Sequence, residues 1–318
     1  MKNLRLALEI ALVRFAIWLL PKLSRPVILR LCEVLGVAAY LIDYRGRAAA
    51  HANLKVAFAK ENIQPEQVRR IAIRSYQTFA RTFMDLFWSR QMGKSNFRSF
   101  CEFDDDFIAT AATAKAHGAL WVTVHYGNFE LTSLAVGYQD IELTVIAQDF
   151  KNAGLTDIFA KLRQGSGHQV IPQQGAMLRL MKELKRKGNT ALLTDLNVKP
   201  NKSAAVIDCF GLKTCVTTLH ASLARRLDLP VILGLCKPLD DGTYHLIFKV
   251  ISHKDYPSDA AMTQAVWDYF EKIIREYPEN WLWMYKHWRY LPGLIRDPLY
   301  PPYANTSSPF RKLMAGKL

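Results

Sequence analysis

The stretch WVTVHYGNFEL, residues 121–131, decides how this chain folds. Its apolar, valine-containing start is the pattern of a buried strand, and that strand is predicted to end at His125. Gly127 and Asn128 form a turn, and Glu130 begins a run with helical spacing. Strand, turn and helix in this order are the building unit of α/β proteins. His125 is therefore expected at the carboxyl end of a strand, where ligands of such sheets bind.

The same texture continues on the carboxyl side of this stretch. Short apolar segments rich in β-branched residues alternate with segments of helical periodicity, which predicts an α/β fold with a mixed, mainly parallel central sheet flanked by helices. The predicted strands are 119–125, 143–148, 191–195, 231–236 and 244–251, and the predicted helices are 155–164, 176–187, 217–226 and 261–276.

The chain shows no internal repeat and no low-complexity linker, so one mixed domain with a helical amino-terminal part is expected. We predict membrane-associated helices over residues 1–45 and one larger domain over 46–318. Within it, 46–117 is expected to be a helical cap and 118–291 the α/β core. The proline-rich end of the chain is predicted to be irregular.

The charge requires an anionic partner. With 42 Lys and Arg against 28 Asp and Glu, the net charge is +14, which suits nucleic acid or a phosphate-rich bilayer surface. No zinc-finger or helix-turn-helix pattern is present, and the aromatics are not spaced as a base-stacking platform, so no nucleic-acid partner is expected. The 7 Trp and 13 Tyr favour a membrane interface, although Trp281, Trp283 and Trp288 could equally pack in the core.

The first 20 residues are apolar but are interrupted by Arg5, Glu9 and Arg14. A charge at the centre of a spanning helix costs a few kcal/mol, and the segment lacks a small-residue cleavage site. We therefore expect helices in or near the interface, although two ordinary amphipathic core helices remain an alternative and spanning is not settled. The basic residues expected to reach lipid headgroups are Lys2, Arg5, Arg14, Lys22, Arg25 and Arg30.

His125 and Glu130 are candidates for an acid–base pair. Across a turn, Glu130 could hold one ring nitrogen of His125 and leave the other free to accept a proton. Such an imidazole can deprotonate a hydroxyl, whose oxygen then attacks a thioester carbonyl. Gly127 would let the backbone approach a substrate closely. Spacing alone favours a merely structural pair, and the strand–His–turn–acid context favours catalysis.

Other chemistries find little support. No H-E-x-x-H occurs, the other seven histidines lack ligand spacing, and the five cysteines form no C-x-x-C. We expect no metal, no cofactor and buried, unreactive thiols. The absence of G-x-S-x-G argues against a serine hydrolase.

HYGNFE (125–130) resembles the H-x4-E box of the lipid A biosynthesis acyltransferase family, a branch of the lysophospholipid acyltransferase-like (glycerolipid acyltransferase) superfamily. Further segments resemble that family in the same order, so the resemblance covers roughly residues 1 to 291. They are YRGRAAAHANLKVAF (44–58), LRQGSGHQVI (162–171), LLTDLNV (192–198), CFGLKTCVTTLHASLARRLDLPVI (209–232) and PENWLWMYKHWRY (278–290).

The resemblance implies acyl transfer from an acyl carrier protein thioester, or acyl-CoA, to a glycolipid at the cytoplasmic face of the bacterial inner membrane. His125 would be the general base and Glu130 its partner. Arg163 would assist the substrate or the oxyanion, although an ordinary surface arginine is an equal alternative. The other residues that the resemblance places at the substrate sites are Gly127, Asn128, Asp195, Phe210, Gly211 and Thr214.

One departure leaves the acceptor open. Many family members have an aromatic-Arg-Pro run where residues 147–152 read AQDFKN, so a cation that could hold a phosphorylated sugar is missing. An aminolipid or another glycolipid is an alternative to a lipid A precursor. Two other classes also stay open: a hydrolase of thioesters or lipids that uses the His–Glu pair to activate water, and a non-enzymatic protein that binds anionic lipid or nucleic acid.

Overall fold

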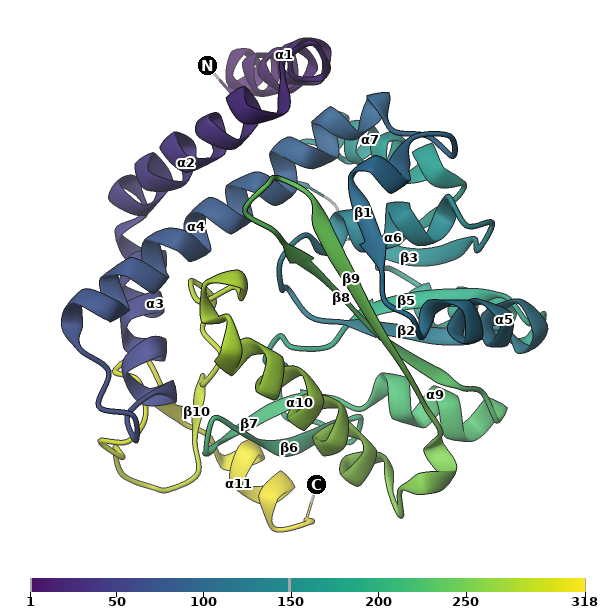
Figure 1. The fold of residues 1–318 in the computed structure, drawn as a ribbon. Coiled ribbons are helices and arrows are strands. Elements are labelled where there is room, and N and C mark those ends of the chain that lie inside the picture. Colours follow the sequence, from purple (N-terminus) through teal and green to yellow (C-terminus); the bar gives the residue numbers. More distant parts are fainter. Residues whose placement is uncertain (1, 148–149, 318) are drawn as a thin grey trace.

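The computed structural model describes residues 2–147 and 150–317 (Figure 1). The Lys2 side chain, predicted to contact headgroups, and the Gln148-Asp149 part of the family departure lie outside the described portion.

A seven-stranded sheet forms the centre, in the order β1-β9-β8-β2-β5-β3-β4 (Figure 1). Every neighbouring pair is parallel except β8 with β9, which confirms the mixed, mainly parallel sheet. The strands are β1 (Cys101–Phe103), β2 (Ala119–Thr123), β3 (Leu143–Ala147), β4 (Gln169–Pro172), β5 (Asn189–Leu193), β8 (Val231–Pro238) and β9 (Tyr244–Ile251).

Helices cover both faces of this sheet, and each face has its own apolar core. One face carries α5 (Phe107–His117), α6 (Phe129–Gly137) and α7 (Ala153–Arg163). The other carries α8 (Ala176–Lys185), α9 (Leu219–Leu227) and α10 (Asp259–Glu276). Trp281, Trp283 and Trp288 are at most 1% exposed and belong to the second core, so they are core residues and not an aromatic rim.

Three parts differ from the sequence expectation. The sheet contains β1 and β4, which are not among the five predicted strands. A hairpin of β6 (Ala204–Cys209) and β7 (Leu212–Thr217), turning at Phe210 and Gly211 with φ of 51° and 79°, was not predicted. The tail is not wholly irregular either, because β10 (Tyr290–Leu291) pairs with β11 (Asn305–Thr306) and α11 (Ser308–Met314) follows. The tail is ordered by Phe310, which is fully buried beneath the hairpin.

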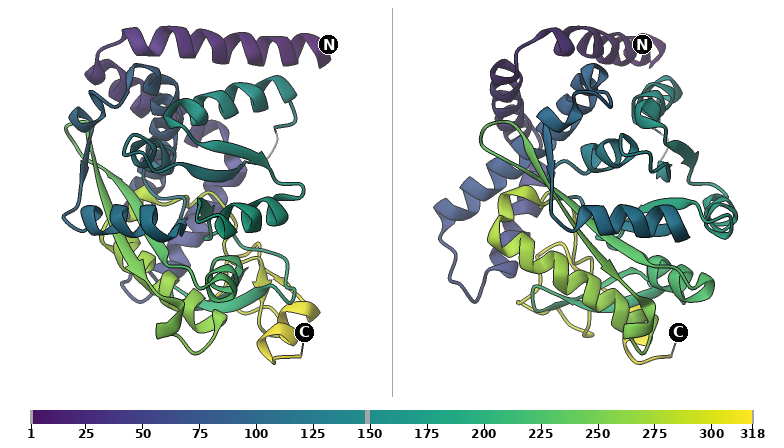
Figure 2. Two further views of the ribbon diagram at one scale, coloured as in Figure 1. Left: turned by 90° about the vertical axis from the view of Figure 1, so that its right-hand side faces the viewer. Right: turned by 45° about the vertical axis from the view of Figure 1, so that its right-hand side comes forward.

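The amino-terminal part is helical: α1 (Lys2–Leu19), α2 (Arg25–Ile42), α3 (Tyr44–Ala57) and α4 (Pro65–Trp88). Figure 2 shows α1 along one side of the molecule, with the rest of the chain beneath it. None of the helices in the described part combines the length and apolar character that a membrane crossing requires. The outer side of α1 is nevertheless apolar and between 54% and 69% exposed, through Leu4, Leu8, Leu12, Phe15 and Trp18.

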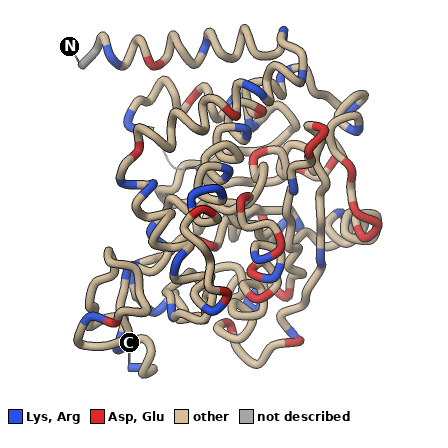
Figure 3. The backbone as a smooth tube through the Cα atoms, turned by 60° about the vertical axis from the view of Figure 1, so that its left-hand side comes forward, with Lys and Arg blue, Asp and Glu red and all other residues tan. Residues whose placement is uncertain are grey.

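One expected headgroup contact is wrong. The Arg25 side chain is only 16% exposed and forms an ion pair with Asp85 of α4. Arg25 is the first residue of α2, and its side chain points inward because α2 packs along α4, which carries Asp85. Arg5 and Arg30, by contrast, are 82% and 81% exposed, and Figure 3 shows how sparsely charges are placed along α1.

Candidate active site

His125 lies just beyond the carboxyl end of β2, and Asp195 lies just beyond the end of the neighbouring β5. Thr123 of β2 pairs with Leu193 of β5 in the parallel register. His125 and Asp195 each follow two positions later, so they are level with each other. The imidazole Nδ1 is 2.8 Å from Asp195 Oδ1, and the backbone N–H of His125 donates to Asp195 Oδ2 at 3.0 Å. The sheet register thus builds a His–Asp pair.

Asp195 is 3% exposed and also accepts a hydrogen bond from the Trp281 indole at 2.9 Å. Burial by itself would raise the pKa of this carboxyl group, but the neighbouring His125 and the Trp281 N–H outweigh it, so the pKa is lowered. A carboxylate at this position requires a proton on Nδ1. Nε2 of His125 is then left as a proton acceptor.

Glu130 lies in the first turn of α6 and pairs with Arg163, the last residue of α7. The guanidinium meets the carboxylate with two bonds, Nε to Oε2 at 2.9 Å and Nη2 to Oε1 at 2.5 Å. Burial would lower the pKa of Arg163, but Glu130 raises it more. Both charges are therefore compensated inside the protein.

The predicted hold of Glu130 on the imidazole is wrong. Among the described residues Nδ1 is held by Asp195, and no hydrogen bond joins Glu130 to His125. The reason is geometric: Asp195 is level with His125 on the adjacent strand, whereas Glu130 has entered α6 and faces α7. A forked guanidinium also matches a carboxylate better than an imidazole does.

Gly127 and Asn128 hold the loop between β2 and α6. Gly127 has φ of 54°, and a Cβ there would lie 1.9 Å from the carbonyl oxygen of Cys236, so only glycine fits. The Asn128 side chain caps α6 by accepting the Leu131 N–H at 3.0 Å. Both lie outside the set of residues that line the neighbouring cavity, and their predicted contact with substrate stays a prediction.

A cavity of about 590 Å³ opens beside His125, between the sheet and α6. Its ionisable groups, His125, Glu130 and Arg163, belong to the site just described. The rest of the wall is mostly apolar, with the uncharged polar residues Thr123, Thr132, Ser133, Gln173 and Thr217. For comparison, a dry cavity of roughly 150 Å³ accommodates a benzene ring. The apolar wall includes Trp121, Phe129, Val136, Leu143, Val145, Ala191, Leu193 and Gly234.

Phe210, Gly211 and Thr214 do not line this cavity. Phe210 is 5% exposed and stacks on Trp281, with ring centroids 5.8 Å apart. The Thr214 hydroxyl donates to the carbonyl of His287 at 2.6 Å. These three residues of the hairpin therefore pack behind Trp281, which donates to Asp195, and it is Thr217, at the end of β7, that reaches the cavity.

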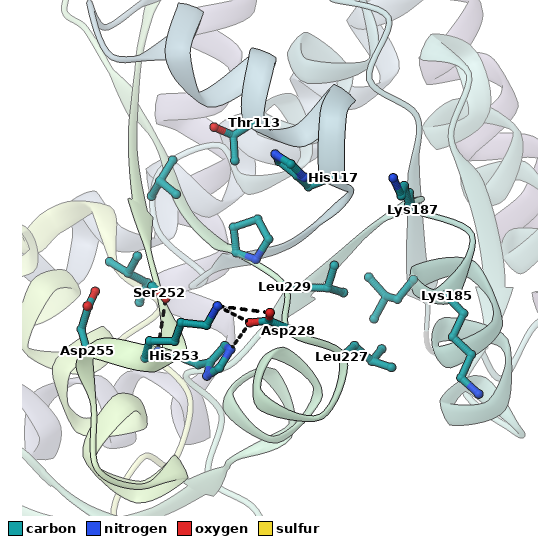
Figure 4. A pocket seen from close by; sticks show the side chains of 15 residues that line it. Thr113, His117, Lys185, Lys187, Leu227, Asp228, Leu229, Ser252, His253 and Asp255 are labelled. Atoms are coloured by element: carbon teal, nitrogen blue, oxygen red, sulfur yellow. Dashed lines mark hydrogen bonds and ion pairs between the residues drawn. The ribbon is translucent and has the colours of Figure 1, made fainter.

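A second hollow, of about 850 Å³, lies at the opposite end of the strands, where β8 begins (Figure 4). Asp228 pairs there with His253 at 2.8 Å and with Lys254 at 2.9 Å. Ligands of parallel sheets bind at the carboxyl ends of strands, and this hollow is at the opposite ends. It is larger than the cavity at His125 but has none of that site's groups.

Sequence reasoning missed the roles of Asp195 and Trp281 as the groups that orient His125. One signal was available: Asp195 ends a predicted strand just as His125 does, and the carboxyl ends of neighbouring parallel strands share one edge. Within the described residues no cluster of three or more metal-ligating side chains occurs.

Comparisons with known proteins identify the family of this chain. The family model of the bacterial lipid A biosynthesis acyltransferases matches residues 2–290. The chain is also similar to the lipid A biosynthesis lauroyltransferase of Escherichia coli (strain K12), with 22% identity over 291 residues, which cover 87% of this chain and 90% of that protein. The family match spans nearly the whole chain, and the chain therefore belongs to the bacterial lipid A biosynthesis acyltransferase family.

Proposed function

We propose that this acyltransferase moves a fatty acyl group from an acyl carrier protein thioester, or from acyl-CoA, to a hydroxyl of a glycolipid, with a lipid A precursor as the first candidate. His125 is the general base. The observation that carries the proposal is an imidazole that lines an apolar cavity, whose Nδ1 is fixed by a buried carboxylate and whose Nε2 has no hydrogen-bond partner among the described residues.

The reaction needs one proton acceptor and no protein nucleophile. Nε2 of His125 takes the proton of the acceptor hydroxyl as its oxygen attacks the thioester carbonyl. Asp195 stabilises the imidazolium that forms, as the orienting carboxylate does in other acyl-transfer sites. The tetrahedral intermediate then expels the thiolate, which takes the proton from His125. The products are an ester and a free thiol, and the base is restored.

Arg163 is proposed to stabilise the negative charge that develops on the carbonyl oxygen or is carried by a phosphate. It lines the cavity together with Glu130, and the two bonds from Glu130 hold its guanidinium in one orientation. On this view Glu130 acts through Arg163 instead of through His125. The H-x4-E spacing then places two groups at one site: the base, His125, and the carboxylate that orients Arg163.

The apolar cavity is proposed to hold the acyl chain. Each methylene buried there contributes about 0.8 kcal/mol, so a chain that fills the cavity is bound tightly without any polar contact. The thioester carbonyl then remains at the polar end, near His125 and Arg163.

Membrane association is proposed for α1 at the cytoplasmic face of the bacterial inner membrane. Its exposed stripe of Leu8, Leu12 and Trp18 suits the headgroup boundary. The net charge of +14 favours an anionic surface. A helix lying in the surface would present the site to lipid acceptors while soluble donors reach it from the aqueous side.

In the test, purified protein in detergent is mixed with a radiolabelled donor, either an acyl carrier protein thioester or acyl-CoA. The acceptor is a lipid A precursor, an aminolipid or lipid extract from the source bacterium. Labelled ester on the lipid A precursor supports the proposal, and label on another lipid corrects the acceptor. Free fatty acid formed at the same rate with and without lipid contradicts it and indicates a hydrolase. Vesicle binding without turnover indicates a binding protein.

A further inference from the structure

A buried polar cluster lies behind the loop that carries His125, outside the cavity. Its members come from α2, α4, the start of α6 and β9. At its centre is Asp85 of α4, which is 3% exposed. The other members are Arg25, Arg81, Asn128 and Tyr244.

Several donors converge on the Asp85 carboxylate. Arg25 meets it with two bonds, Nη1 to Oδ1 at 2.5 Å and Nη2 to Oδ2 at 3.0 Å. The same guanidinium donates to the carbonyl of Gly242 at 2.7 Å. Arg81 Nε is 3.7 Å from Oδ2, and the Tyr244 hydroxyl donates to Oδ2. Charge-assisted bonds of this kind are about twice as strong as neutral ones.

The cluster reaches the catalytic loop through Asn128. The Asn128 amide nitrogen donates to Asp85 Oδ2 at 3.3 Å and to the Tyr244 oxygen at 3.1 Å. The oxygen of the same planar amide group accepts a hydrogen bond from the N–H of Leu131, in the first turn of α6. Since an amide has donors on one side and acceptors on the other, fixing the nitrogen fixes the cap.

We propose that Asp85 is a positioning residue for acyl transfer: it sets the orientation of Asn128 and thereby the start of α6, and Arg25 ties it to the exposed α1–α2 pair. The inference rests on the proposed function, in which His125 on this loop is the base for acyl transfer. Glu130 lies two residues beyond Asn128, so a shifted start of α6 displaces Glu130 and the Arg163 that it holds.

Stability alone does not account for this arrangement. Burying two guanidinium groups and a carboxylate costs desolvation energy, and apolar residues of similar size stabilise a fold at least as well. An apolar contact between α4 and β9 would not select the orientation of the Asn128 amide. The cluster does select it, and the helix that it opens carries Glu130.

The first test compares two tyrosine variants, each of which loses one buried phenolic hydrogen bond. Tyr244→Phe removes the hydroxyl shared by Asp85 and Asn128. Tyr138→Phe removes a hydroxyl that donates to Met92 at 3.0 Å, away from the loop. We expect Tyr244→Phe to lower kcat roughly tenfold, because a small misplacement of reacting groups is costly, with KM for the donor nearly unchanged. Tyr138→Phe should keep kcat within about twofold, since it makes a loss of the same kind elsewhere.

A second pair tests the link to the α1–α2 helices. Arg25→Lys keeps the charge but cannot make two parallel bonds to Asp85, and Arg30→Lys makes the same change at a side chain that is 81% exposed. We expect Arg25→Lys alone to lower kcat, while both variants sediment with vesicles containing anionic lipid as the wild type does. Loss of vesicle binding by Arg25→Lys alone, with kcat unchanged, would overturn the assignment of Arg25 to the cluster.

Amide hydrogen exchange separates failure of this inference from failure of the proposed function. The Leu131 N–H should exchange faster in Tyr244→Phe than in Tyr138→Phe whatever reaction the enzyme catalyses. Equal exchange at Leu131 and equal kcat in both variants would overturn the positioning role of Asp85. A wild-type protein that transfers no acyl group, but shows the expected exchange difference, would overturn the acyl-transfer proposal and leave the link from Asp85 to Asn128 standing.

Discussion

At the scale of single residues, the proposed mechanism requires Asp195 to hold His125 as a base. Asp195→Asn keeps the size of the side chain but removes the charge that stabilises an imidazolium. The remaining oxygen suits the two N–H groups of His125 and Trp281 at the Oδ2 position, so the amide NH2 faces Nδ1 and favours the wrong tautomer. We expect kcat to fall roughly 10,000-fold with a nearly unchanged KM, as for other orienting carboxylates. Steady-state kinetics with a labelled donor give both numbers.

The matched control for that experiment is Asp208→Asn. Asp208 pairs with Lys213 on the surface of the hairpin, with its side chain 56% exposed, so its neutralisation should leave kcat unchanged. If Asp195→Asn retained activity like Asp208→Asn, the His–Asp pair would be structural.

A second residue-scale prediction concerns acid stability. His220 is fully buried, with neither ring nitrogen hydrogen-bonded among the described residues, and burial lowers its pKa to about 4. The unfolded chain takes up this proton near the ordinary value of about 6.5. Between these two values the unfolded state binds more protons, so the free energy of unfolding falls by about 1.4 kcal/mol per pH unit as the pH drops.

His220→Leu removes that contribution and should make the urea midpoint less sensitive to pH between about 6.5 and 4.5, the window that the lowered pKa defines. A slope remains in this variant, because burial also lowers the pKa of His287 to about 4 and lowers the pKa values of His51 and His168. His117→Gln, at an exposed histidine, is the control. A His220→Leu protein with the wild-type dependence on pH would show that His220 is not buried in its neutral form.

At the scale of elements, the loop from β2 to α6 tolerates only glycine at position 127. Gly127→Ala places a Cβ 1.9 Å from the Cys236 carbonyl oxygen, whereas a Cβ at Gly211, which also has positive φ, meets nothing within 4 Å. We expect Gly211→Ala to cost about 1 kcal/mol of unfolding free energy and Gly127→Ala several times more. Urea unfolding measures both, and equal losses would mean that the loop can move away from β8.

Most elements of the sheet could be predicted because parallel strands are buried on both faces and appear as short apolar runs. The hairpin of β6 and β7 was missed because its turn places Phe210 at φ of 51°, a conformation that turn rules assign to glycine or asparagine. The start of α4 at Pro65 follows a local rule of the same kind, since proline is favoured in the first turn of a helix.

The partner of His125 could not be predicted with the same rules. Glu130 is near in sequence, while Asp195 becomes near only when β2 pairs with β5, and strand neighbours are a property of the whole sheet. The burial of Arg25 has the same origin, because its amphipathic surroundings suggest a headgroup contact until α2 packs on α4. The partner of His125 and the burial of Arg25 therefore both depend on which elements pack together in the fold, and not on the local sequence pattern.

At the scale of the whole molecule, α1 is the element expected to meet the bilayer. Leu12→Glu places a charge in a stripe where that leucine is 69% exposed. It should weaken sedimentation with anionic vesicles roughly tenfold or more, because it removes apolar burial and adds repulsion. Ile108→Glu, at an isoleucine of α5 that is 81% exposed, is the control. Equal vesicle binding by both variants would exclude α1 as the contact.

The central claim is that His125 performs acyl transfer, and single-turnover transfer from a radiolabelled acyl carrier protein thioester to a lipid A precursor tests it most directly. Wild-type protein is compared with His125→Gln, and circular dichroism verifies that both are folded. We predict a labelled lipid product with the wild type and a rate lower by roughly 1,000-fold or more with His125→Gln. Transfer at the wild-type rate by a folded His125→Gln protein would contradict the account.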